Sequence, residues 1–142
     1  MSAELSPRLR ELVDALPLRP GIRVLEIGCG PGAAAREVAR RIGSGHVLAI
    51  DRSAKSINQA IAQSASEIAS GNLAFRQASI ETFQLEPFEI PFDIAFAIRV
   101  GALDGRHPQA GELALPRVAA ALVPGGRLFI DGGNPLRELA LA

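Results

Sequence analysis

The chain has 142 residues, of which 48% are hydrophobic and 21% charged, a composition typical of one globular domain and not of a disordered segment. Its 15 basic and 15 acidic residues balance, so the charge leaves no footprint for nucleic acid or for an anionic membrane surface. One cysteine and two histidines exclude an intrachain disulfide and are a poor basis for a zinc site, so we expect a soluble cytoplasmic domain over residues 1–142 without a metal.

The first predicted elements are a helix, a strand and a second helix. Apolar residues recur at spacings of three and four over 4–16, which favours an amphipathic helix, and Pro17 ends it. A short apolar strand follows at 23–27. After a glycine-rich turn the chain returns to helical spacing over 33–42, where Gly43 provides a C-terminal stop.

The alternation of strand and helix then repeats. Residues 47–50 form an apolar strand, and Ser53 is a good N-cap for one helix that continues to about Ser70. A third strand is expected at 73–77. The fourth, at 92–98, is nearly all apolar, as is typical of a strand that is covered on both faces.

The last predicted elements are a helix, a strand and a short terminal stub. The helix lies within 109–122, and Pro116 should delay its start or kink it. A fifth strand at 127–130 follows a Pro-Gly-Gly turn. The stub, residues 132–142, is expected to be helical from residue 135 onwards.

This order predicts an α/β fold, a Rossmann-like doubly wound sheet of about five mostly parallel strands with helices on both faces. The helix and lead-in at 1–20 precede a core over 21–131. The fifth strand would then be an exposed apolar edge, which invites pairing with a second copy of the chain or with a partner. We therefore expect a homodimer, another partner at that strand, or a truncated domain.

The turn after the first strand has the composition of a ligand-binding turn. Its sequence is Glu26-Ile27-Gly28-Cys29-Gly30-Pro31-Gly32. In a doubly wound sheet, ligands bind at the carboxyl ends of the strands. Glycines there let the backbone approach a ligand closely, and the helix that follows offers free N–H groups. Asp51 ends the second strand, where a carboxylate can accept hydrogen bonds from ribose hydroxyls. The pattern indicates a nucleoside-containing cofactor.

Two classes of cofactor fit this turn. Gly28, Gly30 and Ala33 match the spacing of a dinucleotide fingerprint, which would suit an NAD(P)-binding oxidoreductase. Glu26 lies two residues before the first glycine, and its carboxylate would repel a pyrophosphate. The same carboxylate suits a ligand with positive charge, such as an amino group or a sulfonium.

Four segments resemble class I S-adenosylmethionine-dependent methyltransferases, in the order and spacing of that family. They are Val24 to Gly32, Ala49 to Ser53, Phe92 to Ile98, and Leu122 to Leu128 with its Pro-Gly-Gly turn. The resemblance implies S-adenosylmethionine as cofactor, S-adenosylhomocysteine as product, and an enzyme that methylates an unidentified, small-molecule acceptor. The family's sheet usually has two further strands, which this short chain is expected to lack.

The resemblance also implies a role for each matching residue. Glu26 would orient the methionine amino group, Asp51 would hold the ribose hydroxyls, and Arg52 would lie against the adenine. The remaining predicted cofactor-binding residues are Gly28, Cys29, Gly30 and Gly32 under the methionine and ribose, Ser79 and Ile80 at the adenine edge, and Ile98 and Arg99 beside the methionine end.

The loop after the fourth strand holds the candidates for the acceptor side. His107 is a candidate general base, although a histidine in a loop is often only solvated. Arg99 could pair with Asp104, bind a substrate carboxylate or cap the cofactor carboxylate, and the sequence leaves all three open. Two rival functions also stay open, a non-catalytic cofactor-binding or partner-dependent module and, less favoured, the NAD(P)-binding oxidoreductase.

Overall fold

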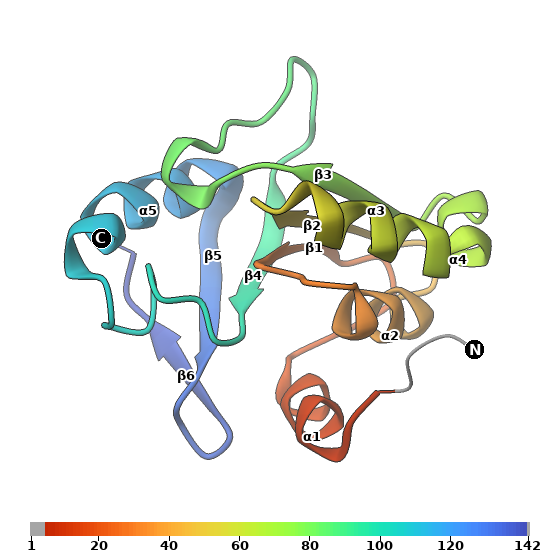
Figure 1. Cartoon of the computed structure of the whole chain (residues 1–142), viewed down its shortest axis with the longest axis horizontal. Helices are drawn as coiled ribbons and strands as arrows, with labels where there is room; N and C mark the ends of the chain where they lie inside the picture. Colours follow the sequence, from red (N-terminus) through yellow and green to blue (C-terminus); the bar gives the residue numbers. More distant parts are fainter. Residues whose placement is uncertain (1–4, 142) are drawn as a thin grey trace.

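A computed structural model describes residues 5–141 of the chain, and Figure 1 shows the arrangement of its elements. The helices are α1 (Pro7–Ala15), α2 (Ala33–Arg41), α3 (Ala54–Gln63), α4 (Ala65–Ala69), the 3-10 helix η1 (Ile80–Thr82) and α5 (Pro108–Ala121). The strands are β1 (Arg23–Ile27), β2 (His46–Asp51), β3 (Leu73–Gln77), β4 (Phe92–Ala97), β5 (Leu122–Asp131) and β6 (Leu136–Leu139). No helix among these residues is long and apolar enough to cross a membrane.

The strands form one sheet in the order β3-β2-β1-β4-β5-β6. The first five are parallel to their neighbours, and β6 alone runs antiparallel, to β5. The order reverses between β1 and β4, which places a ligand crevice at the carboxyl ends of these two strands. The doubly wound, mostly parallel fold expected from the sequence is confirmed.

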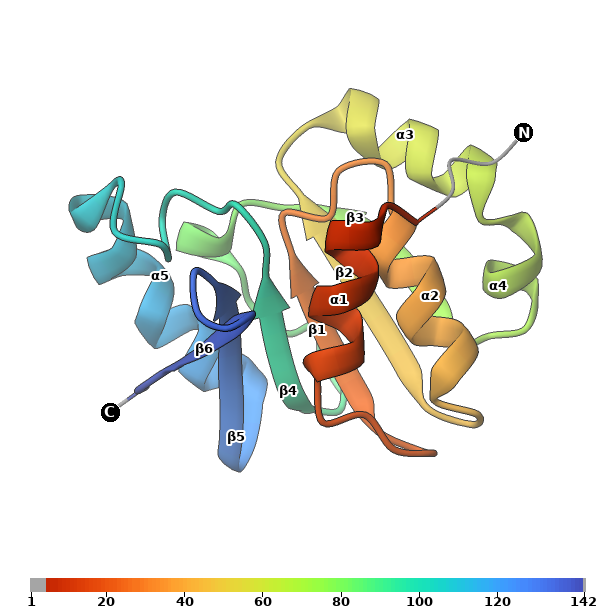
Figure 2. The ribbon, with the colours of Figure 1, turned by 90° about the horizontal axis from the view of Figure 1, so that it is seen from below.

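Helices cover both faces of this sheet because side chains alternate along each strand. Val24 and Val47 face the core that α1 and α2 complete, whereas Leu25 and Leu48 face the core that α5 and η1 complete. Figure 2 shows α1 and α2 lying over the strands on the first of these faces. The buried sides of β1, β2 and β4 leave only their carboxyl ends free to meet a ligand.

The predicted helix between Ser53 and Ser70 is interrupted. Ser53 does cap its start, because its side chain accepts a hydrogen bond from the Ser56 N–H. The helix then breaks at Ser64, whose side chain is completely buried and accepts a hydrogen bond from the Arg36 guanidinium. A buried hydroxyl with a tertiary partner thus outweighs the helical spacing of the local sequence.

Of the two effects expected of Pro116, a late start or a kink, the late start of the last helix is wrong. The helix α5 begins at Pro108, one residue before the predicted window, and continues through Pro116 to its end. A proline at the first helical position needs no N–H partner, so Pro108 starts the helix well. Inside the helix, Pro116 leaves the carbonyl of Glu112 without its usual donor, but both residues are exposed and water can donate instead.

The predicted helical stub is also wrong, since Leu136–Leu139 forms β6 and pairs with β5. The sheet therefore has six strands, and β5 is not the exposed edge that suggested a homodimer or a partner. Arg127 on β5 donates to both carboxylate oxygens of Glu138 on β6, at 3.1 and 2.8 Å, which adds a cross-strand ion pair to the backbone ladder. The edge strand of the sheet is therefore β6, which pairs side by side with residues 128–131 of β5.

Candidate functional site

A cavity of about 1020 Å³ lies where the fold predicts a ligand crevice. Its walls come from the carboxyl ends of β1 and β2, the segments after β3 and β4, and the start of α5. The structure brings together in its lining these sequence-predicted residues: Gly28, Asp51, Arg52, Ser79, Ile80, Arg99 and His107. Residues that are more than 70 positions apart in the chain thus share one chamber.

Asp51 joins the cavity to the glycine turn. One of its carboxylate oxygens accepts a hydrogen bond from the Gly30 N–H at 2.9 Å, and the other accepts one from the Ser53 N–H at 2.9 Å. A carboxylate oxygen can accept more than one hydrogen bond, so each keeps capacity for a ligand hydroxyl. Asp51 therefore holds the turn in place and still presents acceptors at the cavity wall.

Gly28 shows why the turn needs a glycine at the cavity wall. Its φ is +72°, and a Cβ built there would lie 2.6 Å from the Cγ2 atom of Val100. The N–H groups of Gly28 and Cys29 both donate to the Ile50 carbonyl, which fixes the turn against β2. The backbone at Gly28 is therefore closely covered by Val100, a residue that the sequence analysis did not single out.

Replacing Gly28 by alanine is expected to destabilise the fold by about 1–3 kcal/mol, from positive-φ strain and the collision with Val100. A double-mutant cycle with Val100→Ala should recover the part that comes from the collision and leave the strain. Urea denaturation of the four proteins measures both terms. A Gly28→Ala penalty that is the same in the Val100→Ala background would contradict this account of the contact.

Glu26 lies behind the turn, on the side of β1 that faces α2, and is not part of the cavity lining. Only 3% of its surface is exposed, and its Oε1 atom has no hydrogen-bond partner among the described residues. Burial raises the pKa of this carboxyl from its ordinary 4.5 to about 8, with the Asp51 charge adding to the effect and the Arg36 charge opposing it. Buried polar atoms in proteins normally have a hydrogen-bond partner, so the Oε1 atom of Glu26 is an exception to this rule.

The other residues of the turn support it without lining the cavity. Cys29 is buried, and burial, followed by the charges of Glu26 and Asp51, raises the pKa of its thiol, so it is not an activated nucleophile. Gly32 has a φ of +90°, and a Cβ there would meet the Phe75 ring at 2.9 Å. These residues shape the backbone of the turn.

Ile98 lies outside the cavity lining as well. Its side chain packs against the core on the α1 and α2 face of the sheet. Its predicted place beside the methionine end therefore stays a prediction, and the next residue along, Arg99, is the one that lines the cavity.

Arg36 holds the turn from the side away from the cavity, a contact that the sequence analysis missed. Its guanidinium is buried and donates to the Pro31 carbonyl at 2.9 Å and to the Ser64 hydroxyl at 3.0 Å. The two hydrogen bonds of this guanidinium therefore connect the glycine turn to the break between α3 and α4. From the sequence, Arg36 reads as one of the solvent-facing charges of an amphipathic helix, so no local signal separates it from its neighbours.

The segment after β3 adds a carboxylate to the cavity. The Ser79 hydroxyl donates to Glu81 Oε2 at 2.6 Å, and both residues line the cavity together with Ile80. The Ser79 oxygen keeps its lone pairs, so it can accept a hydrogen bond from an amino group while it donates to Glu81. Ser79 and Ile80 were predicted from the sequence, whereas Glu81, the acid that follows them, was not.

The loop between β4 and α5 settles how its charges pair. Asp104 does not pair with Arg99; it pairs with Arg106, whose Nε atom lies 3.0 and 2.9 Å from the two carboxylate oxygens. Asp104 is outside the cavity lining, whereas Arg106 and His107 line it. The His107 ring lies over Gly101, where an added Cβ would come within 3.0 Å of Nε2. Of the three acceptor-side candidates, His107 and Arg99 face the cavity.

Comparison with known proteins places this fold and cavity in context. A methyltransferase domain family matches residues 18–140. Trans-aconitate 2-methyltransferase of Paracidovorax citrulli is 37% identical over 121 residues, which are 85% of this chain and 42% of that protein. The chain spans somewhat less than half the length of the curated relatives that it matches first.

Two solved structures share the fold with similar scores. A SAM-dependent methyltransferase from Geobacter sulfurreducens, solved in complex with S-adenosyl-L-homocysteine, has a TM-score of 0.67 and 25% identity, and the match covers 89% of this chain and 48% of that one. The 4+2 cyclase SpnF has a TM-score of 0.70 and 26% identity, with coverage of 87% and 43%. Proteins with this fold thus carry the names of two different reactions.

Proposed function

We infer the function from family and site together: this chain belongs to the class I S-adenosylmethionine-dependent methyltransferase family. We propose that it binds S-adenosylmethionine in the cavity and catalyses transfer of the methyl group to a small-molecule acceptor. The observation that carries the proposal is Asp51, which lines the cavity at the end of β2 and accepts a hydrogen bond from the Gly30 N–H of the glycine turn. The Glu26 carboxyl lies behind this turn, its Oε1 atom has no partner within the described chain, and the ammonium group of a cofactor bound near the turn would favour its charged form.

The binding roles follow from the position of each residue. Asp51 accepts hydrogen bonds from the ribose hydroxyls at the end of β2, and Gly28 lines the cavity beside Val100, whose side chain occupies the space that a Cβ at Gly28 would need. At the far end of the cavity, the Ser79 oxygen accepts from the adenine amino group and Arg52 lies against the ring. The bound S-adenosylhomocysteine of the Geobacter sulfurreducens protein supports the same class of cofactor here.

Methyl transfer depends more on how the acceptor is positioned than on reactive side chains of the protein. The cofactor, when bound, supplies a methyl group that is already activated by the positive sulfur. The chain has to exclude water and hold the acceptor in line with that methyl group, and such alignment can lower a barrier by up to ~7–11 kcal/mol. His107 is the cavity-lining group that can take a proton from an acceptor hydroxyl or amine. A relative that is 34% identical is named nocamycin O-methyltransferase, which is consistent with an oxygen acceptor.

A second candidate is a domain that binds the cofactor without transferring its methyl group. The likeness to SpnF, which is named a cyclase, favours keeping it, because that fold is as similar to this chain as that of the methyltransferase. The two candidates share the cofactor site and differ in turnover. The NAD(P)-binding oxidoreductase is less favoured, since the family that matches residues 18–140 is a methyltransferase domain.

Calorimetric titration tests the cofactor, and labelled-methyl transfer tests the reaction. We expect micromolar binding of S-adenosylmethionine and S-adenosylhomocysteine and none of NAD. Tight binding of NAD, or no binding of the two sulfur compounds, would overturn the proposal. Binding without transfer of the labelled methyl group to any of several classes of small molecule would favour the non-catalytic domain.

A further inference from the structure

Arg99 has an unfavourable backbone conformation that the fold enforces from two sides. Its φ is +59°, in the left-handed region that residues with a side chain seldom adopt. Its N–H donates to Asp131 Oδ1 at 3.0 Å, and its carbonyl accepts from the Arg106 guanidinium at 2.9 Å. Such a conformation persists only where the surroundings over-determine it, and it clusters at ligand sites. The fold therefore fixes where the Arg99 side chain begins.

The side chain of Arg99 itself has no carboxylate partner among the described residues. It is exposed and lines the cavity. Asp104, the acid nearest to it in sequence, is occupied by Arg106, and Asp131 is engaged by the Arg99 N–H and does not line the cavity. Asp131 thus accepts from the Arg99 backbone and Asp104 pairs with Arg106, so neither acid neutralises the Arg99 guanidinium, which is available to a ligand.

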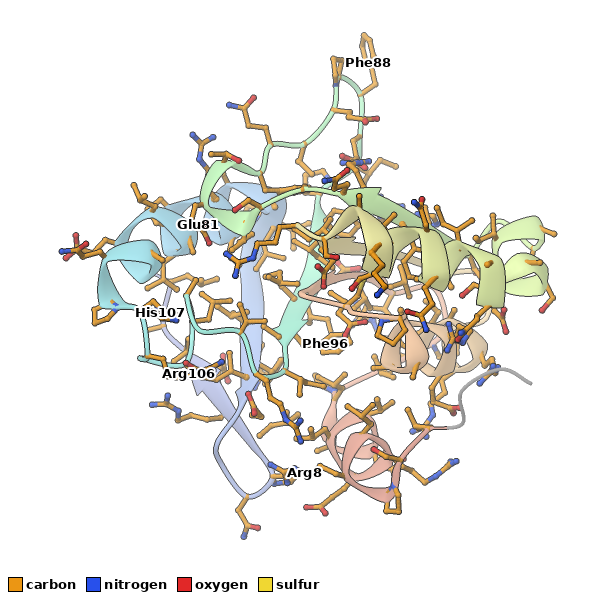
Figure 3. The ribbon with its side chains drawn as sticks, viewed as in Figure 1. Arg8, Glu81, Phe88, Phe96, Arg106 and His107 are labelled. Atoms are coloured by element: carbon orange, nitrogen blue, oxygen red, sulfur yellow. The ribbon has the colours of Figure 1, made fainter. Side chains whose placement is uncertain are left out.

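Both acids of the cavity lining lie on its β2–η1 side, where Arg52 also lies, whereas the charged lining residues on the β4–α5 side are all basic. The acids that line it, Asp51 and Glu81, come from the end of β2 and from η1, which follows β3. Arg99, Arg106 and His107 come from the segment after β4, on the other side of β1. Figure 3 shows Arg106 and His107 on the β4–α5 segment, with Glu81 apart on η1. The helix α5 also starts at this basic end, with no acidic residue in its first turn.

We propose that Arg99 binds a carboxylate of the methyl acceptor, so that the acceptor is a small carboxylic acid. The inference rests on the proposed function, which places the nucleoside at the β2–β3 end and leaves the β4–α5 end for the acceptor. A guanidinium presents parallel N–H groups that match the two oxygens of a carboxylate, and this match gives both charge and orientation. A carboxylate held at a fixed point would orient the rest of the acceptor toward the methyl group.

The test distinguishes acceptor binding from cofactor binding by measuring the two affinities one after the other. The full chain is first titrated with S-adenosylhomocysteine, and the loaded chain is then titrated with citrate, with succinate and with the uncharged succinamide. We expect at least one of the two acids to bind and succinamide not to bind. Arg99→Gln should weaken that acid at least tenfold, and Arg99→Lys should weaken it less, while the affinity for S-adenosylhomocysteine changes by less than twofold.

Arg10→Gln, which removes an exposed arginine from α1, is the matched control and should leave both affinities unchanged. If Arg99→Gln weakens S-adenosylhomocysteine instead, the guanidinium serves the cofactor carboxylate and the proposal is overturned. It is also overturned if neither acid binds the loaded chain, or if the acids bind equally to the wild type and to Arg99→Gln. Failure of the wild type to bind S-adenosylhomocysteine would be a failure of the proposed function.

Discussion

Replacing Asp51 by alanine is expected to weaken the binding of S-adenosylmethionine by about ten- to a hundredfold. Loss of hydrogen bonds between a carboxylate and two ribose hydroxyls corresponds to roughly 1.5–3 kcal/mol. Part of the effect comes through the turn, because the Gly30 and Ser53 N–H groups also lose their acceptor. Calorimetric titration with both sulfur compounds measures the change, and a thermal melt confirms that the variant is folded.

A pair of nucleosides separates the ribose contact from the effect on the turn. Wild-type protein should bind adenosine more tightly than 2′,3′-dideoxyadenosine, and Asp51→Ala should bind the two about equally. Asp14→Ala, which removes an exposed carboxylate from α1, should keep the wild-type preference. A folded Asp51→Ala variant that still prefers adenosine by the wild-type factor would refute the ribose role.

The free energy of unfolding of the ligand-free chain should fall as the pH rises from about 5 to about 8, because of Glu26. Burial raises the pKa of this carboxyl to about 8 in the folded chain, from 4.5 ordinarily. Between these two values the folded chain holds a proton that the unfolded chain has released, so each rise in pH favours unfolding. The limiting slope for one such group is about 1.4 kcal/mol per pH unit. Urea denaturation across this pH range measures it.

Glu26→Gln keeps the size of the side chain and removes its titration, so the variant should lose this slope. Other titrating groups are common to both proteins and cancel in the comparison. A cationic ligand would stabilise the Glu26 carboxylate, so cofactor binding near pH 7 should release a proton from the wild type but not from the variant. The binding enthalpy in phosphate and in Tris, which differ in ionisation enthalpy, reports that proton. Parallel pH profiles for the two proteins would show that Glu26 titrates normally.

Local patterns were sufficient for much of the fold. The strands at 23–27 and 73–77 have the predicted bounds, and the strand near 92–98 differs by one residue. Short apolar runs between glycine turns and amphipathic helices are periodic over a few residues, so neighbouring side chains carry the information. The glycine turn and Asp51 were readable for a related reason, since a doubly wound sheet brings the ends of its strands to one edge.

The errors arose where a segment depends on a distant partner. The four residues of β6 have no apolar periodicity of their own. They form a strand because their backbone pairs with that of β5 and because Glu138 forms an ion pair with Arg127. The break at Ser64 depends on Arg36, which lies 28 residues away. Neither contact leaves a trace in the local spacing of side chains.

The same division holds for the site. The order of residues alone indicated a nucleoside cofactor at the ends of the strands, because glycines and a carboxylate at this spacing are typical of nucleoside-binding sites on doubly wound sheets. The environment of each charge depended on the folded chain: Glu26 without a partner, Glu81 beside Ser79, and Arg99 released because Arg106 takes Asp104. Charges act across space, so which of them are paired, buried or free follows from contacts between segments and not from their order.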